Sequence, residues 1–84
     1  MNKINWLPKA LKQLKKIRSS DQARIMEKVN DLKTFPDCSN VKALTNREDY
    51  RFRVGRYRVL FTVEDGEPLI IYIEEVKKRD ERTY

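Results

Sequence analysis

The chain has 84 residues, of which 39% are hydrophobic and 38% are charged, and its formal net charge is +6. One Trp, four Tyr and three Phe help to supply a small core, so we expect one folded domain over residues 1–84 and exclude a disordered chain. No apolar run approaches the about 20 residues of a membrane-spanning helix, and the N-terminus lacks the apolar segment of a secretion signal. We therefore expect a cytoplasmic protein without a membrane partner.

The residues that usually hold metal ions are scarce. The chain has one cysteine, Cys38, and no histidine, which excludes an internal disulfide and the usual zinc ligand sets. We expect neither a metal nor a cofactor. The pI near 9.6 indicates an acidic partner, either a nucleic acid or an acidic protein segment; the alternative is that the charge serves solubility alone.

The N-terminal part of the chain begins with a possible strand and a helix. KINW at residues 3–6 is the possible strand, and Pro8 suits the first turn of a helix because its missing N–H costs nothing there. Apolar residues then recur at helical spacing, at Leu7, Ala10, Leu11, Leu14 and Ile17.

A second helix follows after a short turn. It is predicted to begin at Ser19, where Gln22 three residues later would complete a capping box, and to end near Phe35 because Pro36 cannot continue it. Its apolar positions are Ile25, Met26, Val29 and Leu32. The two helices together predict a helical hairpin.

After the segment VKAL, the apolar pattern changes from helical to alternating, which indicates strands. We expect three, at about 49–54, 57–64 and 68–76, with Gly55-Arg56 and Asp65-Gly66 in the hairpin turns. The predicted fold is α+β: an N-terminal helical hairpin packed on a twisted antiparallel β-sheet, which consists of a short N-terminal strand plus a three-stranded meander.

The first predicted hairpin gathers arginines on one face. With a two-residue loop, Arg53 lies directly opposite Arg58, and Arg51 points to the same side. The other face is apolar and forms the core, with Tyr50, Phe52, Val54, Tyr57, Val59 and Phe61. Like charges directly opposite one another destabilise a sheet by up to about 1 kcal/mol, so the fold alone gives no reason to keep them.

Three interpretations of this face remain open. The functional one is a phosphate-binding site, because the planar guanidinium offers two parallel donors and keeps its charge. A second is an ordinary cross-strand ion pair between Arg58 and Glu74 or Glu75, and a third is solubility alone. The basic residues that follow extend the positive field, and a terminal ring adds a possible stacking partner for a base. These residues are Lys77, Lys78, Arg79, Arg82 and Tyr84.

Four segments of the chain carry a resemblance to a known family. In order, they are WLPKALKQLKKI, VKAL, YRFRVGRYRVLFTV and VKKR followed shortly by a tyrosine. The sequence resembles the RelE/ParE superfamily of toxins from bacterial type II toxin–antitoxin systems, and in particular the RelE-like branch of mRNA interferases. That resemblance implies the same fold, a twisted antiparallel sheet against a helical hairpin.

The resemblance also implies an activity and its partners. Members of the RelE branch enter the ribosomal A site and cut the message with the 2′-hydroxyl of the preceding nucleotide, without a metal. The implied partners are a cognate antitoxin and the 70S ribosome with its 16S rRNA and mRNA, whereas DNA is bound only through the antitoxin complex. ParE-like members poison DNA gyrase, which is the alternative function. A noncatalytic RNA-binding module or decayed toxin is a third possibility.

The RelE pattern assigns roles to single residues of this chain. Arg53 and Arg58 would clamp the scissile phosphate, Arg79 would steady the transition state and the leaving oxygen, and Tyr84 would stack on or orient the base. Arg51 completes this catalytic set. Lys77, Lys78 and Arg82, which extend the positive field, are the predicted RNA-binding residues.

One position departs from the RelE pattern. Arg51 stands where the family often has a lysine as its candidate general base, and arginine does not release its proton readily. Lys77, Lys78 or a glutamate could take this role, or the ribosome could supply it, or catalysis could depend on electrostatics alone.

Overall fold

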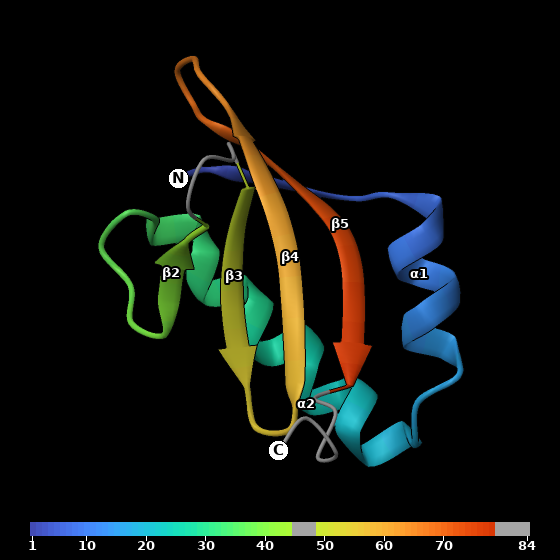
Figure 1. Cartoon of the computed structure of the whole chain (residues 1–84). Coiled ribbons are helices and arrows are strands. Elements are labelled where there is room, and N and C mark those ends of the chain that lie inside the picture. The colour runs from blue at the N-terminus through green and yellow to red at the C-terminus, as the bar shows by residue number, and fades with distance from the viewer. Residues whose placement is uncertain (45–48, 79–84) are drawn as a thin grey trace.

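The computed structural model describes residues 1–44 and 49–78 as two helices and a five-stranded sheet (Figure 1). The strands follow the order β1-β5-β4-β3-β2 across the sheet. The elements are β1 Lys3–Trp6, α1 Pro8–Lys15, α2 Ser19–Val29, the 3₁₀ helix η1 Asn30–Thr34, β2 Val41–Ala43, β3 Asp49–Val54, β4 Tyr57–Glu64 and β5 Ile70–Lys78. The predicted α+β fold is confirmed. None of the helices in the described ranges is long and apolar enough to cross a membrane.

The sheet follows the predicted meander and differs from it in three details. The bounds of β3 and β4 are those predicted, whereas β5 begins and ends two residues later than expected. The segment VKAL, which had no predicted structure, supplies the edge strand β2, antiparallel to β3. The short N-terminal strand β1 is present and pairs with β5 in parallel, so the sheet is antiparallel except at that edge.

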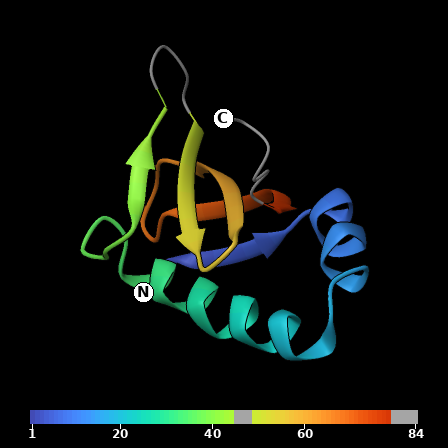
Figure 2. The same ribbon diagram turned by 60° about the horizontal axis from the view of Figure 1, so that its bottom comes forward.

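The two helices cover different parts of the sheet. Figure 2 shows α2 crossing one face of the sheet, while α1 lies beside β5. No helix of the described segments covers the opposite face (Figure 1). We call the face toward α2 the inner face and the uncovered face the outer face. Buried residues from both helices, η1 and the inner face form one core, and they are Ala10, Leu14, Ile25, Val29, Leu32, Phe52, Val54, Val59, Phe61, Ile71, Ile73 and Val76.

The side-chain amides of Gln13 and Gln22 hold the two helices in place, and Gln22 does so without the predicted capping box. Ser19 already belongs to α2, the N-cap position is Arg18, and no side chain caps this end. The predicted capping box is therefore wrong. Gln22 instead donates its Nε2–H to the carbonyl oxygen of Ile17 at 2.6 Å, which ties the first turn of α2 to the chain just after α1. Gln13 of α1 accepts the backbone N–H of Val76 at 2.7 Å, so α1 is held against the edge of β5.

Candidate nucleic-acid interface

Four cationic side chains line a groove of about 370 Å³ on the outer face of the sheet. Arg51 and Arg53 come from β3, Arg58 from β4 and Lys42 from the edge strand β2, and Asn40 and Val41 complete the lining. We call this site the arginine groove. Three of these cations are the arginines that the sequence placed on one face, so the structure brings them together.

The strand register explains why these side chains meet. Arg53 pairs with Arg58 and Arg51 with Leu60 across β3 and β4, as the two-residue turn predicted, and Lys42 pairs with Arg51 across β2 and β3. Directly opposed residues have Cβ atoms only about 4.5–5.5 Å apart and point to the same face. The groove therefore holds two opposed pairs of like charges.

Neither glutamate of β5 neutralises Arg58. Glu75 lies opposite Leu60, and its Oε1 is 3.2 Å from Lys9 Nζ and 3.7 Å from Lys77 Nζ. The hydrogen bond from Lys9, supported by the charge of Lys77, lowers the pKa of the Glu75 carboxyl although burial opposes this effect. Glu74 accepts the Thr62 hydroxyl at 3.0 Å.

The ion-pair interpretation of the arginine face is therefore wrong for these two carboxylates. Among the described residues, no carboxylate forms an ion pair with Arg51, Arg53 or Arg58. The strand neighbour of Arg58 on β5 is instead another cation, Lys77.

A β-bulge in β5 decides which residue lies beside Arg58. Leu60 pairs with Glu75 and Phe61 with Ile73, so Glu74 is an extra residue in β5. If the same residues paired without a bulge, the register would continue from Phe61 and Ile73 and place Val76 opposite Arg58 on the outer face. The bulge instead keeps Val76 in the core opposite Val59.

The predicted RNA-binding residues divide between the two sides of the sheet. Lys77 pairs with Arg58 and extends the positive charge of the outer face. Lys78 pairs with Tyr57 and lines a different cavity, toward the helices. Arg79, Arg82 and Tyr84 lie outside the described residues.

The sequence reasoning missed one groove residue, Lys42. Its segment, VKAL, was too short for an alternation pattern to assign it to a strand. The signal in the sequence is weak, because it is a single step from an apolar to a charged residue, Val41 to Lys42. The structure agrees with it, since Val41 is half-buried and Lys42 is exposed.

No group of three or more metal-ligating side chains occurs within the described ranges. The cations of the outer-face site come from three adjacent strands, β2, β3 and β4. Guanidinium and ammonium groups so placed suit phosphate oxygens, for which arginine supplies paired donors and lysine a point charge.

Comparisons with solved structures place this fold among toxin–antitoxin proteins. The chain is similar to a chain of the RelBE2 toxin–antitoxin complex from Mycobacterium tuberculosis, with 25% identity over 92% of this chain and 96% of that one and a TM-score of 0.79. It resembles the isolated E. coli RelE toxin with 19% identity over 96% and 87% of the two chains and a TM-score of 0.77. The Pyrococcus horikoshii RelE–RelB complex gives 23% identity, coverage of 95% and 97%, and a TM-score of 0.77.

The sequence itself gives a family assignment. A search of curated proteins found no significant match. The family model described as the ParE toxin of the type II toxin–antitoxin system parDE matches residues 4–83. That match covers nearly all of the chain and agrees with the RelE-like fold, so the chain belongs to this family of type II toxin–antitoxin toxins, within the RelE/ParE superfamily that its sequence resembles.

Proposed function

We propose that this toxin is an endoribonuclease that cuts mRNA in the ribosomal A site and so inhibits translation. The observation that carries the proposal is the arginine groove, in which Lys42, Arg51, Arg53 and Arg58 converge without a carboxylate partner among the described residues. Repulsion within such a cluster is relieved when a polyanion binds. Binding of nucleic-acid phosphates would explain why these cations lie together, whereas the stability of the fold does not explain it.

The proposed reaction needs charge stabilisation above all. The 2′-oxygen of the nucleotide before the scissile bond attacks phosphorus, the bond from phosphorus to the 5′-oxygen breaks, and the products carry a 2′,3′-cyclic phosphate and a 5′-hydroxyl. The pentavalent transition state gains negative charge on its phosphoryl oxygens. Arg53 and Arg58, directly opposed across two strands, are our assigned donors to those oxygens.

Lys42 is our assigned acceptor of the 2′-hydroxyl proton. Among the side chains that line the arginine groove, it is the one basic group that can act as a neutral amine, since guanidinium groups remain protonated. In that neutral form its nitrogen lone pair would take the proton. It also lies directly opposite Arg51, the position where a lysine is often found in the RelE branch. Lys42 on the neighbouring strand would therefore supply the proton acceptor that Arg51 cannot.

The remaining roles come from the resemblance to the RelE branch. Arg79 would steady the transition state and the leaving 5′-oxygen, which takes its proton from water, and Tyr84 would stack on or orient the base. Arg82, part of the basic run after β5, would contact RNA. Lys77 would add a phosphate contact next to Arg58, whereas Lys78 belongs to the cavity on the helix side. The proposed partners are a cognate antitoxin, the 70S ribosome with its 16S rRNA, and mRNA in the cytoplasm, with no cofactor.

A second candidate function is inhibition of DNA gyrase. The family model that matches the chain is the ParE model, and this observation favours it. In that case the toxin would act by binding a protein, and the arginine groove would not perform chemistry.

Two assays on one preparation separate the candidates. Purified ribosomes programmed with a defined A-site codon should yield cut message when the toxin is added, while gyrase should continue to supercoil plasmid DNA. Lys42→Arg, which keeps the charge but removes the proton acceptor, should lower the cleavage rate about a hundredfold. Lys12→Arg, an exposed substitution on α1, is the matched control. Intact message together with blocked supercoiling would transfer the assignment to the gyrase-directed function.

A further inference from the structure

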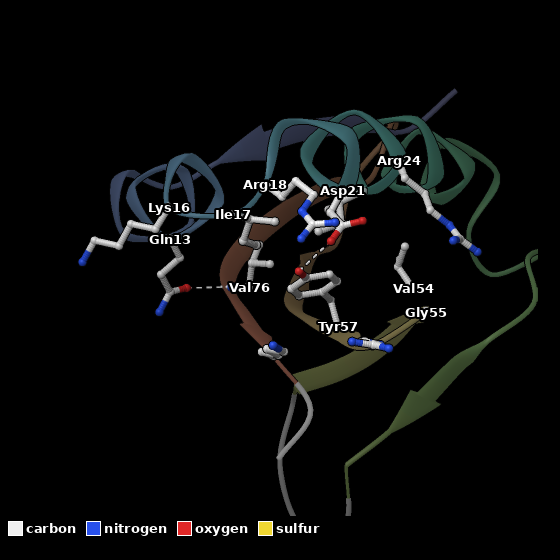
Figure 3. A pocket seen from close by; sticks show the side chains of 13 residues that line it. Gln13, Lys16, Ile17, Arg18, Asp21, Arg24, Val54, Gly55, Tyr57 and Val76 are labelled. Atoms are coloured by element: carbon white, nitrogen blue, oxygen red, sulfur yellow. Dashed lines mark hydrogen bonds between the residues drawn. The ribbon is translucent and has the colours of Figure 1, made fainter. Parts of the chain in front are cut away.

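A second cavity lies on the helix side of the sheet, at the end where β3 turns into β4 (Figure 3). It has a volume of about 610 Å³ and opens between this turn and the junction of α1 and α2. Its lining is strongly basic. The cationic residues are Lys16, Arg18, Arg24, Arg56 and Lys78, and the acidic one is Asp21.

The single carboxylate of this cavity already has a partner. The Tyr57 hydroxyl donates to Asp21 Oδ2 at 2.9 Å, a contact that Figure 3 shows beside the Arg18 side chain. Burial and this hydrogen bond raise the pKa of the Tyr57 hydroxyl, while the charges of Arg18 and Arg56 lower it. Both guanidinium groups therefore lie within electrostatic range of the Tyr57–Asp21 contact.

A third guanidinium reaches the same place from α2. Gly55 has a φ of +55°, and its lack of a side chain leaves room over the turn. The guanidinium carbon of Arg24 lies 3.9 Å from the position that a Cβ on Gly55 would take. Among the described residues, none of these arginines forms an ion pair with a carboxylate. Positive charge at this site thus exceeds negative charge.

The cavity and the arginine groove lie at the same end of the sheet. Arg58 faces the groove and the adjacent Tyr57 faces the cavity, one residue or about 3.4 Å along the strand. On β5, Lys77 and Lys78 alternate between the two sides in the same way. A flexible polyanion that leaves the groove across the turn would therefore meet the cavity next.

The cavity offers little to an amphipathic protein segment. Of its aliphatic lining residues, Ile25, Val54 and Val76 are already buried in the core, and Ile17 is half-buried. A peptide helix or strand would find little apolar surface to cover there. Guanidinium groups that converge from α2 and the turn instead match the oxygens of a phosphate.

We propose that this cavity is a second phosphate-binding subsite, which holds the backbone of the same RNA strand whose scissile phosphate lies in the arginine groove. The identity of that strand rests on the proposed function. The subsite positions the strand and takes no part in bond cleavage.

The test is the salt dependence of RNA binding by the full chain. The probe is a labelled single-stranded RNA of about 12 nucleotides, within the range of single-strand site sizes, with 2′-O-methyl groups throughout so that it cannot be cut. The double variant Arg24→Gln/Arg56→Gln removes two of the cavity cations. The matched control, Lys28→Gln/Lys33→Gln, removes two exposed cations that line neither site.

We expect the cavity variant to reduce the slope of log K against log salt by about 1.4, or about 0.7 for each lost phosphate contact. Its affinity at about 0.1 M salt should fall about 25-fold. The control should change the slope less than half as much. Equal changes in the two variants, or an unchanged slope in the cavity variant, would overturn the proposal. So would a cavity variant that loses affinity only for the antitoxin, because the site would then bind protein.

Two further measurements keep the outcomes separate. Thermal unfolding shows whether the double variant folds; if it does not, Arg56→Gln alone, in the exposed turn, should reduce the slope by about 0.7. Ribosomal cleavage by the unchanged protein tests the proposed function independently. Cleavage with an unaffected slope overturns the cavity subsite alone, whereas a reduced slope without cleavage overturns the nuclease and leaves the cavity as an RNA-binding subsite.

Discussion

The two faces of the β3–β4 hairpin carry opposite kinds of side chain on the same backbone. On the inner face, Phe52 and Val59 are opposed and buried in the core. One residue further along, Arg53 and Arg58 are opposed on the outer face, where no helix of the described segments covers them. The strand alternation alone separates a stabilising pair from a repulsive one.

This difference shows how a small protein tolerates a charged site. Burial of apolar side chains such as Phe52 stabilises the fold by about 1.5–3 kcal/mol each, whereas an opposed pair of like charges costs at most about 1 kcal/mol. The inner face can therefore hold the hairpin in place against the repulsion on the outer face. Stability and the proposed activity should accordingly respond to different substitutions.

The largest effect is expected from the inner face. Phe61 is fully buried, and its ring lies 5.3 Å from that of Tyr50 and 5.6 Å from that of Phe35. Phe61→Ala should lower the free energy of unfolding by about 3–5 kcal/mol in denaturant titrations, because it leaves a cavity among these rings. Leu60→Ala, one residue away on the outer face, is the control and should cost clearly less. Equal losses would show that the two faces do not differ in this way.

The second effect is expected from the outer face and concerns activity. Arg58→Ala should slow ribosomal mRNA cleavage at least a hundredfold, about 2.7 kcal/mol in the transition state, since a donor to the phosphoryl oxygens is lost. Its unfolding free energy should stay the same or rise by up to about 1 kcal/mol as repulsion from Arg53 is relieved. We expect the same loss of cleavage for Arg79→Ala. Normal cleavage by both variants would refute the groove as the active site, and loss of folding in Arg58→Ala would give that arginine a structural role.

The β3–β4 register was predictable because it depends only on local rules. A two-residue turn at Gly55-Arg56 fixes which residues are opposed, and alternation then assigns each side chain to a face. The arginine pair followed from these rules directly. The bounds of both strands also followed, because the turn sets their inner ends at Val54 and Tyr57 and the alternation stops at the acidic residues Asp49 and Glu64.

Features that depend on tertiary contacts were less predictable. The apolar residues Ile71, Ile73 and Val76 are spaced by two and then by three, as expected of a strand with a bulge. This spacing can be interpreted as a bulge only once the pairing of β5 with β4 is known. The hydrogen bond from Gln22 likewise depends on the position of the Ile17 carbonyl group, which is set by how the chain turns after α1.

The candidate site was predictable only where it depends on the local rules of the hairpin. Three arginines on two adjacent strands could be placed from the turn alone. Lys42 joins them through an edge strand of three residues, too short to show alternation. The helix-side cavity gathers Arg18, Arg24 and Arg56 from separate segments, and no periodic pattern links them.

A smaller effect is expected where the hairpin meets α2. Tyr57→Phe removes the hydrogen bond to Asp21 and should lower the unfolding free energy by about 1 kcal/mol at neutral pH. Since the pKa of the folded Tyr57 is raised above 10.0, the hydroxyl contributes fully below that pH and loses its contribution as pH rises toward the folded value. The difference in unfolding free energy between the unchanged protein and Tyr57→Phe should therefore shrink above about pH 10 in denaturant titrations. A difference that stays constant across this range would exclude the hydrogen bond as its cause.

The smallest effect concerns Glu75, a carboxylate on the outer face of β5. Glu75 forms ion pairs with Lys9 and Lys77 and none with Arg58, so the charge of Arg58 in the groove is not neutralised by Glu75. Lys9→Ala should lower the unfolding free energy by about 0.2–1 kcal/mol at pH 7, the range for exposed ion pairs, while Lys12→Ala on the same helix serves as the control. Because the pKa of Glu75 is lowered below 4.5, this contribution is present above that pH and disappears as pH falls through the folded value.

Cleavage is the sharper measurement for this variant. If Glu75 without Lys9 stays with Lys77, the groove keeps its charge and the cleavage rate of Lys9→Ala should equal that of the unchanged protein. A clear fall in rate, with folding intact, would mean that the released carboxylate neutralises Arg58 across the strand. The excess of positive charge on the outer face would then depend on α1 as well as on the alternation within the hairpin.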